Sequence, residues 1–422
     1  MKRINRFGIV LFCGLMLTAC GNIENTVATD GNSFSESLGW ETATRMGVEI
    51  IADSAGLLAE QAPGEQESET SERPEQELEQ PTEPEPIPEP VITTVTISAA
   101  GDVTLGTNQK HSYSKSFHEY YDKYGKEYFL QKVKSVFEAD DFTIINCEGT
   151  FTESDKRMDK LWNHKGKPEY VEILTCASVE AVTLGNNHIM DYGEGGVADT
   201  IQTVTNAGLE YALSGPWGNH YGMYEVKGVK IGFVSVNEHY DELECYPWLE
   251  DGLKTLREAG ADIVIACTHW GDDYFHEIGQ EQYDMGRWCI DQGYDLVLGC
   301  HPHLLQGIEL YKDKYIVYSM GNFCYGGNKN PAEKDSMIFQ QTFTFVDGEL
   351  QTDTDAIRVI PCRLSSSTNK NDYCPMICEG EMAEETIANL NMYCEEFGIK
   401  FDLDGYLLKE EEEEQAQDSS QE

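Results

Sequence analysis

Positive charge is scarce in this chain of 422 residues. Lysine and arginine together number 30, against 75 aspartates and glutamates, so the formal net charge is −45. Nucleic-acid binding proteins hold their polyanion on a basic surface, and this composition excludes that class. A polyanionic partner of any kind would have to be met through bound cations.

The first apolar run is too short for a membrane span. Phe7–Leu17 has 11 residues, follows three basic residues among the first six, and precedes "LTAC", which resembles a bacterial lipobox. We therefore predict a lipoprotein signal peptide over residues 1–20, with Cys20 as the lipid attachment site. The protein would then be extracytoplasmic and anchored to the cell membrane. The alternative is an ordinary signal peptide that contains an incidental cysteine.

Two further segments lack the apolar residues that a core needs. Residues 60–90 contain 11 glutamates and 7 prolines, and residues 409–422 are also acidic. We predict a disordered acidic Pro/Glu-rich linker over 21–92 and a disordered acidic tail over 409–422. A folded domain over 93–365 would lie between them, with a C-terminal extension over 366–408 that includes one helix.

The 13 cysteines show no spacing typical of a zinc knuckle. Cys13 and Cys20 fall in the predicted signal, which leaves an odd number that cannot pair completely. Several of the others lie in apolar, strand-like runs and are predicted to be buried thiols. A disulfide within the late cluster stays open: Cys362, Cys374, Cys378 and Cys394.

Strand-like runs alternate with helical patterns after residue 92, which predicts an α/β fold of helices layered on sheets. The segment 128–140 has helical periodicity, and 308–323 is typical of a hairpin that turns at Lys312–Lys314. The later strands have shorter connections, so we expect a mixed or antiparallel second sheet.

Five strand-like runs end in side chains that bind metals or move protons. In α/β folds function collects at the carboxyl ends of strands, so we expect these groups to share one pocket. Carboxylate, imidazole and amide ligands favour Mn, Fe or Zn, and one or two ions would use this many of them. The strand-end residues are Asp102, Asn146, Glu148, Asn187, His188, His269, His301 and His303.

The histidine pair in "GCHPH" is the strongest single signal. On an extended chain, residues two apart point to the same side, so His301 and His303 would both face the pocket while Pro302 faces away. The same alternation turns Cys147 and Cys300 into the core. A polar stretch at Trp162–His164 could line a cleft, but a surface loop is favoured.

These motifs, taken in order, resemble one family. "SAAGDVTLG", "INCEGTF", "TLGNNHIMDYGEGG", "THWGDDY", "GCHPHLLQG" and "YSMGNF" are similar to the CapA family of capsule (poly-γ-glutamate) synthesis proteins. That domain is similar to calcineurin-like metallophosphoesterases. The match covers roughly residues 95 to 326, and it implies a four-layer α/β/β/α sandwich.

The resemblance also implies roles for individual residues. Asp102 and His303 would hold one metal ion, and Glu148 would bridge to a second. His188 would donate the proton to the leaving group, oriented by Asp191. The second ion would be held by Asn187, His269 and His301, and Asn146 and Asn322 would support the site from behind the ligands.

The sequence departs from the phosphoesterase pattern at two positions. Thr104 stands where that pattern has a histidine, and Glu148 stands where it has an aspartate. One metal position therefore loses a ligand, so either the site is mononuclear or its first ion is weakly bound and exchangeable.

Three hypotheses for the function remain open, and the third assigns no metal to the histidines. The first is a metal-dependent hydrolase acting on a phosphoester or an amide-linked polymer, within capsule or poly-γ-glutamate biosynthesis, export or anchoring. The second is a non-catalytic, metal-dependent surface protein that binds or tethers an anionic polymer. The third is a surface binding protein whose histidines are structural.

Overall fold

The computed structural model describes residues 88–241, 244–352 and 357–408. The predicted signal peptide with Cys20, nearly all of the predicted linker and the acidic tail lie outside these ranges. Among the helices of the described part, none has the length and apolar character needed to span a membrane.

The larger sheet is mixed and has nine strands in the order β18-β17-β15-β1-β3-β6-β7. In addition, β14 pairs with β1, and β16 pairs with β15. Neighbours β1, β3, β6 and β7 run parallel, whereas β15 pairs antiparallel with both β1 and β17. The strands are β1 (Ile92–Thr104), β3 (Phe142–Cys147), β6 (Ala181–Thr183), β7 (Glu210–Ala212), β14 (Asn322–Tyr325), β15 (Asp335–Val346), β16 (Glu349–Leu350), β17 (Ile357–Arg363) and β18 (Met376–Ile377).

A second mixed sheet has six strands in the order β12-β13-β11-β10-β9-β8. Its centre is parallel, and the predicted hairpin is confirmed as β12 and β13, which are joined at Lys312 and Asp313. A small third sheet pairs β2 (Thr107–Asn108), β5 (His164–Gly166) and β4 (Thr150–Phe151). The second sheet comprises β8 (Tyr221–Val226), β9 (Val229–Asn237), β10 (Ile263–His269), β11 (Leu296–Cys300), β12 (Ile308–Tyr311) and β13 (Lys314–Val317).

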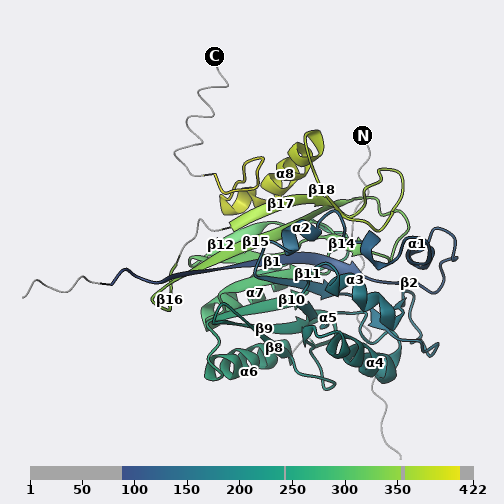
Figure 1. Cartoon of the computed structure of the whole chain (residues 1–422), viewed down its shortest axis with the longest axis horizontal. Coiled ribbons are helices and arrows are strands. Elements are labelled where there is room, and N and C mark those ends of the chain that lie inside the picture. Colours follow the sequence, from purple (N-terminus) through teal and green to yellow (C-terminus); the bar gives the residue numbers. More distant parts are fainter. Residues whose placement is uncertain (1–87, 242–243, 353–356, 409–422) are drawn as a thin grey trace, which may run out of the picture. The chain divides into compact units, whose positions relative to one another are not determined.

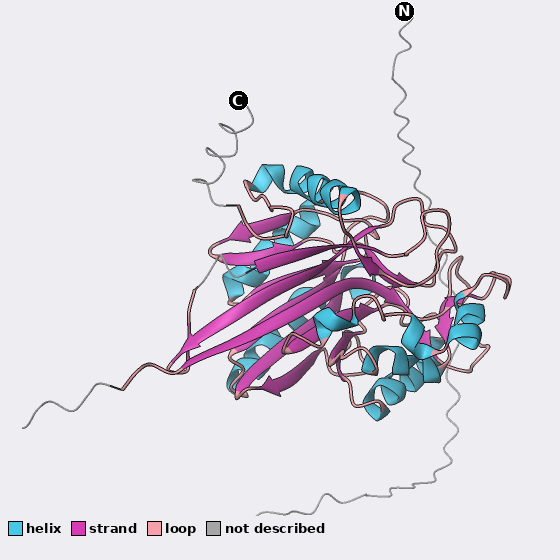
Figure 2. Cartoon of the chain, turned by 45° about the horizontal axis from the view of Figure 1, so that its top comes forward, coloured by secondary structure: helices cyan, strands magenta, loops and turns pink. Residues whose placement is uncertain are grey.

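Three buried clusters divide the domain into four layers. The central cluster joins inward residues of both sheets, such as Ile97 and Ile265. A second lies between the larger sheet and its helices, and a third lies between the smaller sheet and α6 and α7. Figures 1 and 2 show the sheets with helices packed against them. This confirms the predicted α/β class and is compatible with the four-layer α/β/β/α sandwich. The helices are α1 (Phe117–Tyr124), α2 (Lys134–Phe137), α3 (Glu172–Thr175), α4 (Gly193–Asn206), α5 (Glu238–Asp241), α6 (Cys245–Glu258), α7 (Gln280–Gln292) and α8 (Glu381–Cys394), with 3-10 turns at Lys126–Tyr128, Pro168–Val171 and Glu395–Phe397.

The C-terminal segment 366–408 contains the expected helix as α8. Its residues Ile387, Leu390 and Cys394 enter the central cluster, and β18 adds an edge strand beside β17. The cysteines of the late cluster are buried free thiols, so the structure forms no disulfide among them.

The helix predicted over 128–140 is shorter than its periodicity indicated. Phe129, Val133 and Phe137 are buried on one face as expected. The backbone, however, forms a 3-10 turn at Lys126–Tyr128 and a four-residue helix α2, with turns between them. Burial of the apolar face can be achieved by successive turns, so the pattern alone did not decide the helix length.

Candidate metal centre

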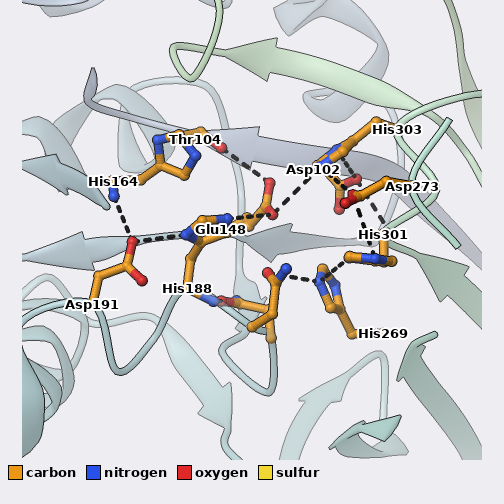
Figure 3. A network of polar contacts seen from close by, with 12 residues as sticks. Asp102, Thr104, Glu148, His164, His188, Asp191, His269, Asp273, His301 and His303 are labelled. Carbon is orange, nitrogen blue, oxygen red and sulfur yellow. Dashed lines mark hydrogen bonds and ion pairs between the residues drawn. The ribbon is translucent and has the colours of Figure 1, made fainter. Parts of the chain in front are cut away.

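The five strand ends converge at one edge of the two sheets, as the sequence predicted. Parallel strands present their carboxyl ends to the same edge, which brings β1, β3 and β6 together in one sheet and β10 and β11 in the other. Asn146 Nδ2 lies 2.7 Å from Asp102 Oδ1 on the neighbouring strand, and it also reaches across to the other sheet, where it lies 3.2 Å from His269 Nδ1. Figure 3 shows the resulting network of polar side chains.

Asp102 is placed by an irregularity in β1. The register of β1 shifts on both of its flanks at this point, between Ala100 and Asp102 against β3 and between Asp102 and Thr104 against β14. Gly101 permits the close approach to β14, because a Cβ there would lie only 1.9 Å from the carbonyl oxygen of Gly321. The Asp102 carboxylate is fully buried, and its Oδ2 lies 3.0 Å from His303 Nδ1.

His301 and His303 reach the pocket by a route that the sequence reasoning got wrong. Strand β11 ends at Cys300, and the two histidines do not continue it as extended chain. They adopt positive φ angles of 100° and 61°, which are unusual for residues with a side chain. Such strain is retained at functional sites where the surroundings enforce it. The two rings therefore face the site because of a tight turn.

His269 is the centre of one group of candidate ligands. Its Nε2 lies 3.0 Å from His301 Nδ1 and 3.2 Å from Asn187 Oδ1. Two nitrogens bound to one ion at about 2.1 Å each are about 3 Å apart at a right angle and about 3.4 Å apart in a tetrahedron, so this spacing is close to that of a shared cation. The three side chains are those expected to hold the second ion.

Glu148 has the clearest unmet requirement in the site. Its side chain is fully buried, and Oε2 accepts a hydrogen bond from the Thr104 hydroxyl at 3.2 Å. Oε1 has no hydrogen-bond partner within the described part of the chain, although it lies 3.7 Å from His188 Nε2 and 3.8 Å from His303 Nε2. A buried carboxylate oxygen without a partner is costly, and a bound cation would satisfy it.

Within residues 88–241, 244–352 and 357–408, two groups of histidine and acidic side chains are close enough to share an ion. One is Asp102, Glu148 and His303, and the other is Asp273, His301 and His303. Glu148 does not join His269 and His301 in such a group. The bridging role of Glu148 therefore stays a prediction.

One proton offsets part of the negative charge in the first group. Burial raises the pKa of Glu148, and the charge of His303 opposes that rise. Burial by itself would lower the pKa of His303, but Glu148 and Asp102 raise it to about 9. We place the proton on His303, because Asp102 also accepts from this imidazole. Metal ligands must be deprotonated, so a cation would compete with this proton.

A second cluster surrounds His188. Its Nδ1 lies 2.7 Å from Asp191 Oδ2, and Asp191 Oδ1 lies 2.5 Å from Lys160 Nζ. Burial raises the pKa of Asp191 to about 6, while the Lys160 charge lowers it. Burial, and then Lys160, lowers the pKa of His188 well below its usual value. The imidazole is therefore neutral, and its Nε2 faces Glu148.

Asn322 lies behind one of the candidate ligands. Its Oδ1 is 3.1 Å from His303 Nδ1, and its Nδ2 donates to the His303 carbonyl at 3.1 Å. Asn146 likewise contacts two candidate ligands, because its Nδ2 lies near both Asp102 Oδ1 and His269 Nδ1. The amides fix the orientation of imidazoles and carboxylates, a role that outer-shell groups have in metal sites.

The sequence reasoning missed several residues of the site. The surface-loop interpretation holds for Trp162, which is exposed, but it was wrong for Asn163 and His164, which are buried. His164 begins β5, donates its backbone N–H to Asp191 Oδ2, and has its ring centroid 4.1 Å from that of His188. Asp273, in "THWGDDY", was also overlooked. The ring centroid of His239 lies 4.0 Å from that of His301.

The comparison with known families agrees with the order of the motifs. Residues 96–326, more than half of the chain, match the model of the family "Bacterial capsule synthesis protein PGA_cap". The chain belongs to this family. The resemblance found in the motifs is thereby confirmed.

Two individual relatives of this chain are also capsule or PGA biosynthesis proteins by name. The chain is 28% identical over 268 residues to the capsule biosynthesis protein CapA of Bacillus anthracis, covering 58% of this chain and 63% of that one. It is 30% identical over 219 residues to the PGA biosynthesis protein CapA of Bacillus subtilis, covering 48% and 57%. The match thus spans about three fifths of each relative.

One solved structure has low sequence identity and low structural similarity to this chain. A phosphatase from Mycoplasma pneumoniae overlaps 67% of this chain and 96% of its own, with 13% identity and a TM-score of 0.39. An overlap of this size has no bearing on activity.

Proposed function

We propose that this PGA_cap protein is a lipid-anchored, extracytoplasmic participant in capsule or poly-γ-glutamate biosynthesis, export or anchoring, with a metal-dependent hydrolase-type site. The family match and the names of the Bacillus relatives support the process. The "LTAC" motif at Cys20 supports the anchor. The network at the strand ends supports the site.

The observation that carries the proposal is the unsatisfied Oε1 of Glu148, buried between the Nε2 atoms of His188 and His303. Its requirement is for positive charge, and only oxygen and nitrogen donors surround it. Such a donor set fits Mn, Fe or Zn. One or two ions would be held by Asp102, Glu148, Asn187, His269, His301 and His303.

A divalent ion bound here would supply an activated water and would stabilise developing negative charge. The protein's own residues move the proton. Asp191 fixes His188 with its Nδ1–H directed at the carboxylate, which leaves Nε2 to take up a proton and deliver it to the leaving group. Lys160 neutralises the second oxygen of Asp191, so the carboxylate can stay ionised in a buried place.

The partner we propose is an anionic polymer resembling poly-γ-glutamate, or else a phosphoester. With a net charge of −45, the protein would repel either one at long range. Bound cations at the site offset that repulsion locally. This is a second reason to expect a metal.

Two variants test the proposal. His188→Ala should retain the metal of the full-length chain and lose turnover of a p-nitrophenyl phosphodiester or of poly-γ-glutamate by about 10²-fold or more. His301→Ala should lose metal and turnover together. His220→Ala is the matched control, because that imidazole pairs with Asp251 and stacks on Trp248.

The outcomes separate the two candidate functions. Turnover that survives in His188→Ala would contradict the catalytic assignment. Metal binding without turnover of either substrate class would favour a non-catalytic, metal-dependent polymer-binding protein. The replacement of a histidine by Thr104 is the feature that keeps this alternative open.

A further inference from the structure

The loop that follows β10 is tied to the turn that carries the two histidines. Trp270 N donates to the Cys300 carbonyl at 3.1 Å, and Tyr274 N donates to the Pro302 carbonyl at 2.9 Å. Between these two anchors lies Asp273. Its placement is therefore fixed from both sides by backbone hydrogen bonds.

Asp273 directs one oxygen at both histidines. Oδ1 lies 3.5 Å from His301 Nε2 and 3.6 Å from His303 Nε2. The other ring nitrogen of each histidine is already in contact with the site: His301 Nδ1 faces His269, and His303 Nδ1 faces Asp102. The two Nε2 atoms are therefore the ones that face Asp273. The carboxylate is 58% exposed, whereas the two imidazoles are buried. The group thus lies on the solvent side of the network. Figure 3 shows Asp273 beside His301 and His303.

We propose that Asp273 is a metal ligand, which together with His301 and His303 binds a divalent transition-metal ion on the solvent side of the site. Two imidazoles and one carboxylate with open positions form a recognised donor set for such ions. A neutral imidazole offers one nitrogen lone pair, so an ion bound at the Nε2 atoms of His301 and His303 would replace an ion bound through their Nδ1 atoms and would not add to it. The inference rests on the proposed function, because it uses two of the same histidines.

The competing explanation is an ion pair between Asp273 and protonated His303. The two explanations differ in what Asp273→Asn does. The amide cannot replace a carboxylate as an anionic ligand, so metal affinity falls if Asp273 binds the ion. If Asp273 forms only an ion pair, affinity is retained.

The experiment is a titration of the metal-free, full-length chain with Mn²⁺ and Zn²⁺ by calorimetry. Asp273→Asn should lose one equivalent or bind at least about tenfold more weakly, and the visible absorption of bound Co²⁺ should change. Asp272→Asn, one residue away and exposed, should match the wild type. Both variants should keep the melting temperature of the metal-free wild type, since both side chains are exposed.

Two results would overturn the inference, and they are distinguishable. If the wild type binds the metals and Asp273→Asn binds them with unchanged stoichiometry and affinity, the role of Asp273 is wrong and the proposed function stands. If the wild type binds no ion at all, both are wrong.

Discussion

Asp191 Oδ2 and His188 Nδ1 lie 2.7 Å apart, and both side chains are almost completely excluded from solvent. The same oxygen accepts the backbone N–H of His164, and the other carboxylate oxygen pairs with Lys160. Three residues from two stretches of the chain thus fix the imidazole of His188. Such a third group, behind a histidine, sets its tautomer and direction.

Asp191→Asn should lower turnover while leaving metal content unchanged. The amide has nearly the same shape but can present its NH₂ to His188, which favours the wrong tautomer. We expect a loss of about 10² in kcat or more. Steady-state kinetics together with metal analysis checks this. A kcat equal to that of the wild type would show that His188 needs no partner.

Lys160→Met should move the acidic limb of the pH–rate profile to higher pH. Burial raises the pKa of Asp191 to about 6, and the charge of Lys160 is the largest of the effects that lower it. Removal of the cation raises that pKa, so a smaller fraction of Asp191 is ionised at a given pH. The expected displacement is about one pH unit.

The control for this variant is Lys167→Met, whose ammonium pairs with the exposed carboxylate of Glu169. Its profile should coincide with that of the wild type. An unmoved acidic limb in Lys160→Met would show that Asp191 does not govern the activity.

Gly101→Ala should destabilise the fold and impair metal binding together. The new methyl would lie 1.9 Å from the backbone oxygen of Gly321, which cannot move without separating β14 from β1. We expect a loss of about 2 kcal/mol or more in the free energy of unfolding. Gly195→Ala is the matched control: it is exposed in α4, with no atom within 4 Å of the new Cβ, and should be neutral or slightly stabilising. Denaturant unfolding of the three proteins checks this, and equal stabilities would contradict the strand geometry.

The late cysteine cluster should behave as four free thiols. Cys362, Cys374, Cys378 and Cys394 are all at most 4% exposed, so native protein should protect them from alkylation. After unfolding without reductant, mass spectrometry should find all four alkylated. A peptide pair linked through two of them would contradict the structure.

The strand-end residues could be predicted from sequence because their positions follow from topology. Parallel strands deliver their carboxyl ends to one edge, so Asp102, Glu148 and His269 had to lie near one another once the α/β alternation was recognised. His301 and His303 were correctly placed for an incorrect reason. The alternation argument assumed extended chain, whereas a turn with positive φ brings both rings inward.

Asp273 and His164 could not be found in this way. Both depend on loop conformation: Asp273 on two backbone bonds to the histidine turn, and His164 on pairing of short β5 with β2 and β4. No periodicity in the sequence encodes these contacts. An acidic residue four positions after a predicted ligand, in "THWGDD", was the only available signal, and exposed aspartates in loops are common.

The central claim is that the buried Glu148 carboxylate exists to bind a cation, and Glu148→Gln tests it most directly. The measurement is the melting temperature of the full-length wild type and of Glu148→Gln, each with a chelator and with saturating Mn²⁺. Ligand that binds only the folded state raises stability by about 2.7 kcal/mol at 100 times Kd. The account predicts a clear rise with Mn²⁺ for the wild type, a smaller rise for the variant, and a variant at least as stable as the wild type in chelator. A wild type that is indifferent to Mn²⁺, or a variant that responds equally, would contradict it.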